Sequence, residues 1–232
     1  MDNLIVSPSY NIIDKVPTFQ IYTFNIDTDT KPTITINVPN ASNLSNGSVT
    51  KSYVYASYYD YNDRKNCKLL VLNRAANRII KTISLGDIYE SEISNIIEDP
   101  ITGKIAMMRT RYGSKYLTVF DNNMNKIKDE FNVGDTGPRL TKQSFFYDGY
   151  IYSSNANGEY VKYDYVSQNN VNTYPCRTNA TVMNVNAKRI FLVESGELLD
   201  FDLNLIEKFN NASDVWLENE EQNLNGGGFS IY

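Results

Sequence analysis

The chain has 232 residues, a formal net charge of −5 and a hydrophobic fraction of 41%. These values favour one globular domain and exclude a collagen-like or wholly disordered chain. The acidic balance, without a cluster of Lys and Arg, argues against a nucleic-acid surface, which needs cations to displace phosphate counterions. The sequence has no His, which removes Ser-His-Asp and Cys-His catalytic groups and imidazole metal ligands.

Aromatic residues are abundant, with 18 Tyr and 10 Phe, and together with Ile, Val and Thr they favour strands. Asn is also frequent and suits the turns between short strands. No run of about 20 apolar residues is present to span a bilayer, and no signal-peptide pattern opens the chain. We therefore expect a soluble protein, cytoplasmic or in a virion, without membrane insertion.

One pattern occurs five times along the chain. An apolar or aromatic residue and two variable residues precede Leu, Phe or Tyr, and then Asn or Asp, and the closing residues are Asn25, Asn73, Asp121, Asp164 and Asp202. Their separations of 48, 48, 43 and 38 residues fit a propeller blade of four strands, for which about 40 to 50 residues is usual. Each Asn or Asp is expected to close a polar turn by accepting backbone N–H bonds.

Strand-like runs surround each copy of the pattern. In chain order, the predicted strands are residues 19–25 and 33–38, then 53–56, 69–73 and 78–85, then 94–97, 105–108, 117–121 and 126–133, then 144–147, 150–153, 160–164 and 169–176, then 190–193, 198–202 and 205–209. Turn residues such as Asp148-Gly149 lie where the hairpins must reverse. The sequence therefore predicts an all-β, five-bladed β-propeller.

Residues 72–86 and 120–134 resemble the second half of the YVTN-type β-propeller repeat. The likeness is carried by the Leu72-Asn73 and Phe120-Asp121 pairs, the polar turns that follow them and the glycines Gly86 and Gly134. It is weaker in the fourth and fifth repeats, where the closing Gly is absent. The resemblance implies a propeller architecture and brings no enzymatic motif with it.

Ring closure is predicted from the two ends of the chain, because an open ring would leave two sheet edges unpaired. Residues 19–25 and 33–38 read as the third and fourth strands of a blade, and residues 214–218 and 229–232 as its first and second strands. On this reading residues 229–232 pair at the edge of Ile21. The propeller domain then comprises residues 19–232. Residues 1–18 form an N-terminal arm or an extra strand, which lies along its own blade or docks on a partner.

Catalytic and metal-binding candidates are few. Glu98, Asp99 and Asp148 could serve a glycosidase, which uses paired carboxylates, but Asp-Pro and Asp-Gly at hairpin reversals are also ordinary turn chemistry. The run Asp60-Tyr-Asn-Asp63 lacks the ligand spacing of an EF-hand and is read as a solvated loop. Cys67 and Cys176 fall in different repeats and are expected to be reduced thiols.

A binding face is the stronger prediction, because the loops between second and third strands emerge on one side of a propeller. The candidate binding residues on these loops are Tyr58, Tyr59, Tyr61, Arg111, Tyr112 and Asn155. Tyr and Arg anchor protein interfaces, although a Tyr-rich chain shows Tyr everywhere. We expect a noncatalytic interaction or structural module without a cofactor. Its partner would be another protein, for example in a virus or phage particle. The alternatives are a carbohydrate-binding propeller, in which Trp216 stacks on sugars, and a glycoside hydrolase.

Overall fold

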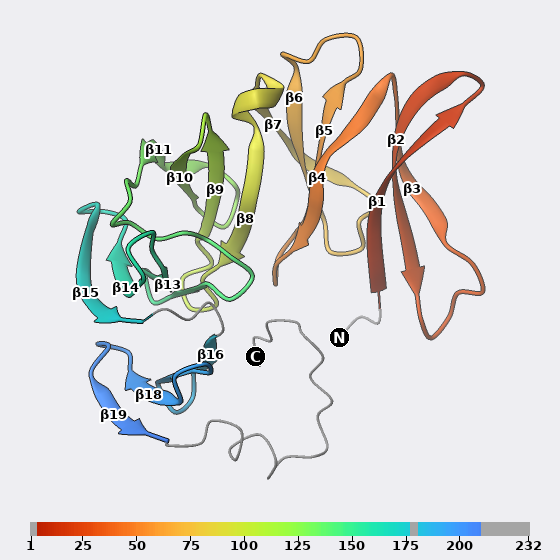
Figure 1. The fold of residues 1–232 in the computed structure, drawn as a ribbon. Helices are drawn as coiled ribbons and strands as arrows, with labels where there is room; N and C mark the ends of the chain where they lie inside the picture. Colours follow the sequence, from red (N-terminus) through yellow and green to blue (C-terminus); the bar gives the residue numbers. More distant parts are fainter. Residues whose placement is uncertain (1–3, 177–180, 210–232) are drawn as a thin grey trace. The chain divides into compact units, whose positions relative to one another are not determined.

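The computed structural model describes residues 4–176 and 181–209, except the side chains of residues 4 and 45–47. The fold is all-β, and its strands form five antiparallel sheets that follow one another along the chain (Figure 1). Apart from the strands, the described part of the chain has one short 3-10 helix, η1 (Ile88–Glu90). The prediction of an all-β fold built from successive sheets is confirmed.

The first sheet has the order β1-β2-β3, with β1 at Leu4–Ile13, β2 at Val16–Asn25 and β3 at Thr33–Pro39. Asp14 and Lys15, with φ of 49° and 68°, make the two-residue turn between β1 and β2. Two positive φ angles are the mark of a type I′ turn, whose twist matches that of antiparallel strands. The chain therefore reverses here without a glycine.

In this hairpin the N-terminal segment forms a strand along its own sheet, which agrees with one of the two predicted readings and moves its boundary. The proposed boundary at residue 18 falls inside β2, and Pro8 of β1 lies opposite Ile21. The edge that was expected to receive residues 229–232 is thus occupied by β1. The other predicted C-terminal strand, residues 214–218, and Trp216 within it lie outside the described residues, as do residues 229–232.

Each of the other four sheets has four strands in chain order. The second sheet contains β4 (Ala41–Val49), β5 (Val54–Asp60), β6 (Cys67–Leu72) and β7 (Ile79–Gly86). The third contains β8 (Glu92–Glu98), β9 (Ile105–Arg111), β10 (Ser114–Phe120) and β11 (Lys126–Asn132). The fourth contains β12 (Phe145–Tyr147), β13 (Tyr150–Ser154), β14 (Glu159–Asp164) and β15 (Asn169–Pro175), and the fifth contains β16 (Thr181–Asn184), β17 (Arg189–Leu192), β18 (Glu197–Asp200) and β19 (Leu205–Lys208).

The recurrent Asn or Asp closes the turn after the third predicted strand, as expected. The Oδ1 atom of Asn73 accepts hydrogen bonds from the backbone N–H of Asn77 (3.1 Å) and Arg78 (3.0 Å), and Asp121 Oδ1 accepts one from Asn125 N at 2.8 Å. In the fifth sheet this role belongs to Asp200, which accepts from the N–H of Asp202 (2.8 Å) and Asn204 (2.9 Å). The fifth turn residue was therefore placed two positions too late.

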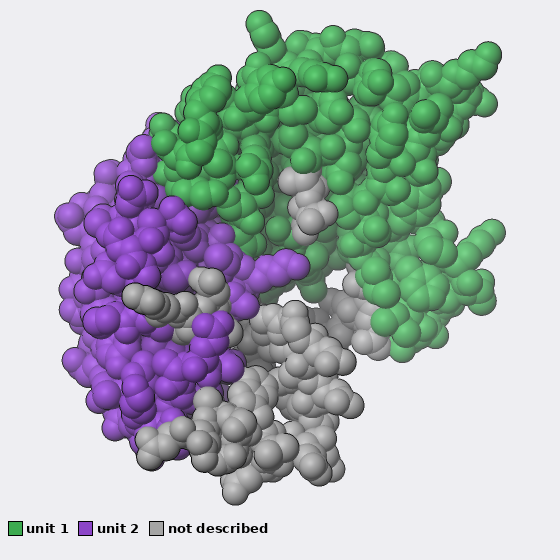
Figure 2. All heavy atoms as spheres, in the orientation of Figure 1, with its two compact units in different colours: residues 1–96, 109–116, 122–124 green, residues 97–108, 117–121, 125–232 purple. Residues whose placement is uncertain are grey.

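The chain forms two compact units, drawn in green and purple in Figure 2. Unit 1 comprises residues 1–96, 109–116 and 122–124, and unit 2 comprises residues 97–108, 117–121 and 125–232. In unit 1, Phe19 and Ile21 of β2 are packed with Val54 and Leu70 of the second sheet. The apolar face of the first sheet is thereby buried, and fully burying such a side chain stabilises the fold by about 1.5–3 kcal/mol.

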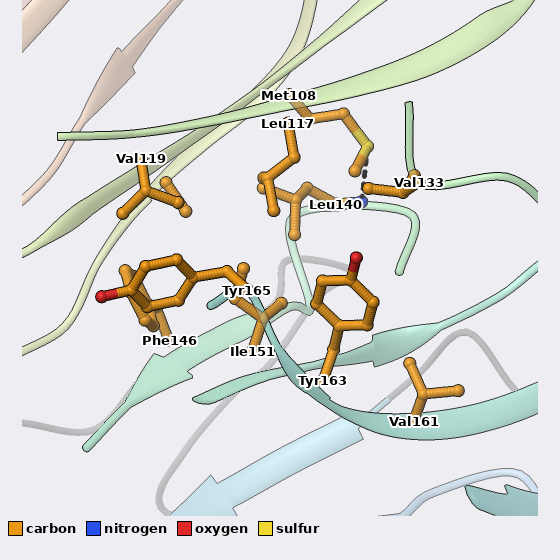
Figure 3. Packing of buried hydrophobic residues seen from close by; sticks show 11 residues of the cluster. Met108, Leu117, Val119, Val133, Leu140, Phe146, Ile151, Val161, Tyr163 and Tyr165 are labelled. Atoms are coloured by element: carbon orange, nitrogen blue, oxygen red, sulfur yellow. Dashed lines mark hydrogen bonds between the residues drawn. The ribbon is translucent and has the colours of Figure 1, made fainter. Parts of the chain in front are cut away.

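Buried apolar residues also form clusters in the described part of unit 2. One joins strands of the third and fourth sheets through Leu117, Val119, Ile151 and Val161 (Figure 3). The other joins the fourth and fifth sheets, and its buried residues include Tyr152, Tyr160, Ile190 and Leu199. Within each unit, successive sheets thus bury facing side chains against one another, which explains the apolar alternation seen in the sequence.

Candidate functional site

The candidate site consists of three exposed tyrosines on loops of unit 1, Tyr61, Tyr89 and Tyr112, and is called the tyrosine surface below. Their exposed fractions are 50%, 70% and 78%. Tyr61 follows β5, Tyr89 lies in η1 between β7 and β8, and Tyr112 lies between β9 and β10. Figure 1 shows the β5–β6 loop and η1 at the same end of their strands, toward the top of the view.

Backbone hydrogen bonds hold two of the three segments that carry this surface, the β5–β6 loop and η1. Ile88 N donates to Arg64 O at 2.9 Å, which joins η1 to the β5–β6 loop. Tyr61 N donates to Asn40 O at 2.7 Å and fixes the start of the same loop. The loops are therefore held in place before any partner binds.

The position of Tyr89 is set by the way η1 begins. Asp87 is the N-cap of this helix, and its Oδ1 atom accepts a hydrogen bond from Tyr89 N at 2.9 Å. The hydroxyl of Ser91 donates to Leu85 O at 3.0 Å and closes the other end of the turn. The backbone is satisfied locally, as capping requires, and the Tyr89 ring is left in solvent.

The β9–β10 hairpin presents Tyr112. Tyr112 and Gly113 have φ of 49° and 83° and form a two-residue turn that projects the tyrosine at its tip. The charge of Glu90 and a hydrogen bond to this carboxylate raise the pKa of Tyr112. The hydroxyl group of Tyr112 therefore keeps its proton at neutral pH and can donate a hydrogen bond.

Arg111 and Arg109 link the hairpin to η1. Arg111 Nη2 forms an ion pair with Glu90 Oε2 at 3.0 Å, and the Arg111 guanidinium lies 5.2 Å from the centre of the Tyr116 ring. Arg109 Nη2 donates to the carbonyl oxygens of Leu85 (2.5 Å) and Glu90 (2.6 Å). Both guanidinium groups are therefore pre-oriented by their contacts, so less side-chain entropy is lost when a partner binds.

The structure places the six predicted binding residues in different settings. Tyr61, Arg111 and Tyr112 are on the tyrosine surface or beside it, whereas Tyr58 stacks on Phe19 with ring centres 5.4 Å apart. Burial, and to a lesser extent Asp60, raises the pKa of Tyr58. Tyr59 is half-buried in β5 opposite Cys67.

Asn155 belongs to unit 2 and organises a turn. It is buried, its Oδ1 accepts from the N–H of Asn157 (2.9 Å) and Glu159 (3.0 Å), and its Nδ2 donates to Thr136 O at 3.1 Å. Sequence reasoning also missed Tyr89, because a single 3-10 turn has no periodicity. The Asp87 and Ser91 pair around Ile88-Tyr89-Glu90 was the available signal.

Of the three carboxylates weighed for glycosidase chemistry, Asp99 has a structural role. Asp99 is fully buried, and its Oδ1 accepts from the N–H of Ile101 (2.9 Å), Thr102 (3.3 Å) and Asp148 (3.1 Å). Its Oδ2 accepts from the Thr102 hydroxyl (2.6 Å) and Gly149 N (2.8 Å). A carboxylate with five such donors ties the β8–β9 turn to the β12–β13 turn and is not placed to exchange protons with a substrate.

The acidic loop and the thiol beside it also have structural roles. The Oδ1 atoms of Asp60 and Asp63 accept hydrogen bonds from Asn62 N (2.9 Å) and Lys65 N (3.0 Å), as in turns closed by Asx residues. Cys67 is fully buried, and burial raises the pKa of its thiol. A low thiolate fraction makes this cysteine a poor nucleophile.

The chain folds into successive antiparallel sheets. This all-β fold is similar to solved structures with β-propeller-like folds. An ACO/RPE65 chimera matches with a TM-score of 0.50 and 11% identity over 90% of this chain and 58% of that one. BBS1N in complex with ARL6DN matches with a TM-score of 0.50 and 12% identity over 84% of this chain and 64% of that one. The dihydro-heme d1 dehydrogenase NirN in complex with DHE matches with a TM-score of 0.51 and 11% identity over 87% and 46%.

These likenesses concern the fold, and the chain spans less than two thirds of each of these structures. No protein-family model matches the sequence, and neither does any curated protein. The similarity to YVTN-type repeats therefore rests on the sequence pattern alone. These comparisons do not support a role in a virus particle or a glycan ligand. Among the described residues, no helix is long and apolar enough to cross a membrane.

Proposed function

We propose that this chain is a noncatalytic protein-interaction module and that another protein docks on the tyrosine surface. The observation that carries the proposal is the joint presentation of Tyr61, Tyr89 and Tyr112 on loops linked by hydrogen bonds within unit 1. Tyrosine buries a large area for few rotatable bonds and is enriched among residues that dominate binding energy.

The rigidity of the loops strengthens the proposal. Association costs free energy when loops and side chains must be ordered at the interface. Here Ile88 N–Arg64 O, Arg109 Nη2–Leu85 O and the Arg111–Glu90 ion pair hold the loops in advance. A partner would gain the contacts of the tyrosine rings with little of that cost.

The architecture behind the proposal is a five-bladed propeller in which each sheet is a blade. Support comes from the five sheets in chain order, their repeated Asx turns and the propeller-like folds of similar structures. BBS1N, one of these, is in complex with another protein, ARL6DN. Binding a protein partner would be a comparable use of such a fold.

The test is the triple variant Tyr61→Ala, Tyr89→Ala and Tyr112→Ala. A partner is first identified by cross-linking and mass spectrometry in the source of the protein, and its affinity is then measured by calorimetry with purified components. Because each anchoring tyrosine is worth about 1–2 kcal/mol or more, the variant should bind at least about tenfold more weakly. Its melting temperature should be unchanged, since the three rings are exposed.

A matched control removes exposed apolar side chains elsewhere, through Ile26→Ala, Ile101→Ala and Val166→Ala. This control should retain full affinity. Equal weakening by both variants, or none by the tyrosine variant, would refute the tyrosine surface as the docking site. If a glycan bound the wild type and not the tyrosine variant, the ligand of the tyrosine surface would be a carbohydrate and not a protein.

A further inference from the structure

The last strands of the five sheets differ in how their outer edges are protected. These strands are β3, β7, β11, β15 and β19, and each has one partner strand in the described part of the chain. An outer strand presents a row of backbone N–H and C=O groups to which another strand can add, and natural proteins prevent this with charges or proline. The composition of each strand therefore indicates whether its edge is protected.

Four of these strands carry such protection. β3 and β15 end in proline, at Pro39 and Pro175. β11 has four charged side chains among its seven residues, and β19 has two among its four. Charges and missing N–H groups both disfavour pairing with a further strand. These four edges are therefore suited to remain in solvent.

The edge of β7 lacks this protection. The strand reads Ile79-Ile-Lys-Thr-Ile-Ser-Leu-Gly86, without proline and with one charged residue, Lys81. Within unit 1, the Nζ atom of Lys81 donates to Met124 O at 2.6 Å, so the β10–β11 turn holds its ammonium group. Ile79 and Ile80 are exposed to 44% and 41%. A strand rich in β-branched residues and low in charge pairs readily with another strand.

We propose that β7 pairs with β7 of a second copy of this chain, antiparallel and with Thr82 opposite Thr82. Two identical strands that pair across a two-fold axis close the edges of both molecules, because the interface is isologous. With Thr82 on the axis, residues 79–85 of the two strands are paired. The inference goes beyond the proposed docking of another protein and does not depend on the tyrosine surface.

Charge and overlap favour this register. A centre at Lys81 would place two ammonium groups opposite each other, and directly opposed like charges are destabilising. A centre at Ile83 would leave the exposed Ile79 unpaired. A centre at Thr82 places Lys81 opposite Ile83 and forms a Thr–Thr pair, which is favourable in antiparallel sheets. The sequence of β7 is thus self-complementary, which supports a second copy as the occupant of this edge.

The first test measures self-association of the full-length chain. Sedimentation equilibrium up to submillimolar concentration should show a monomer–dimer equilibrium. Thr82→Lys places two ammonium groups at the axis and should weaken the dimer about fivefold or more. The matched control is Thr173→Lys on β15, which also replaces an exposed threonine of an outer strand. This control should leave the dissociation constant of the dimer unchanged.

The second test is mild oxidation of single-cysteine variants, alongside the unchanged chain, whose two thiols are buried. Directly opposed residues lie within reach of a disulfide, so Thr82→Cys should form a linked dimer. Ser84 would lie opposite Ile80, which separates the two Ser84 residues by about 14 Å along the strands. Ser84→Cys alone should therefore give no linked dimer, whereas a mixture of Ser84→Cys and Ile80→Cys chains should.

Three results would overturn the proposal: a monomer at every concentration, equal weakening by both lysine variants, or equal cross-linking at positions 82 and 84. The Tyr61, Tyr89 and Tyr112 alanine variant should dimerise like the wild type, because its substitutions lie outside β7. Partner docking lost in that variant while the dimer persists would support both proposals. The dimer and the docking site can therefore fail independently.

Discussion

Asp99 illustrates how the surroundings of a residue decide between chemistry and structure. In the sequence, the Asp99-Pro100 pair is compatible with a catalytic acid and with a turn. In the structure, the same carboxylate is buried and accepts hydrogen bonds from two separate turns. These donors satisfy both oxygens of the carboxyl group, as burial of a polar group requires.

Replacing Asp99 by Asn should therefore destabilise the protein. The new amide nitrogen cannot accept hydrogen bonds, so either Gly149 N and the Thr102 hydroxyl or the donors to the other oxygen lose their acceptor. A loss of about 2–4 kcal/mol in unfolding free energy is expected, measured by urea titration. Asp148→Asn is the control, since Asn tolerates the positive φ of 49° at this position. An Asp99→Asn variant as stable as this control would contradict the structural role.

At the scale of elements, the β1–β2 hairpin is the feature that the sequence hid. Its turn, Asp14-Lys15, has the positive φ angles of a type I′ turn without the Asn-Gly or Asp-Gly pair that usually reveals one. The strands on either side were consequently read as an arm or extra strand and as a third strand, with no turn between them. A β-branched run on both sides, Ile12-Ile13 and Val16, was the only local hint of a hairpin.

Lys15→Gly should stabilise this hairpin. Glycine adopts a φ of 68° without the penalty of about 1 kcal/mol that a side chain incurs there. The melting temperature should rise by about 2–4 °C for a chain of this size, as measured by scanning calorimetry. The same change at Lys31, which is exposed and has no positive φ, should give no rise; a rise at both positions would point to a general effect of glycine or of charge.

At the scale of the whole molecule, the chain passes between the two units several times. Three of the boundaries fall within β8, β9 and β10, and the other two lie in the turn between β10 and β11. A strand that contributes residues to both units cannot unfold in one and stay intact in the other. The two units are therefore expected to unfold together.

The two cysteines provide a test of this cooperativity, because Cys67 lies in unit 1 and Cys176 in unit 2, and both are buried. In the single-thiol variants Cys176→Ser and Cys67→Ser, the reaction of the remaining thiol with Ellman's reagent is followed across a denaturant titration. In each variant, the denaturant midpoint of thiol exposure should coincide with the midpoint at which the same variant loses its β-sheet circular dichroism signal. Two thiols exposed at clearly different fractions of unfolding would show that the units unfold separately.

The sequence by itself determined the strand-rich class, the repeated unit and its Asx turns, because side-chain alternation and turn chemistry are local properties of the chain. The absence of His likewise fixed which catalytic groups could not occur. Only the tertiary structure decided that β1 lies beside β2, that Tyr58 packs on Phe19 and Asn155 is buried while Tyr89 is exposed, and that Asp200 closes the last turn. Strand partners and burial depend on contacts between residues distant in sequence, and the free energy of those contacts cannot be read from a local pattern.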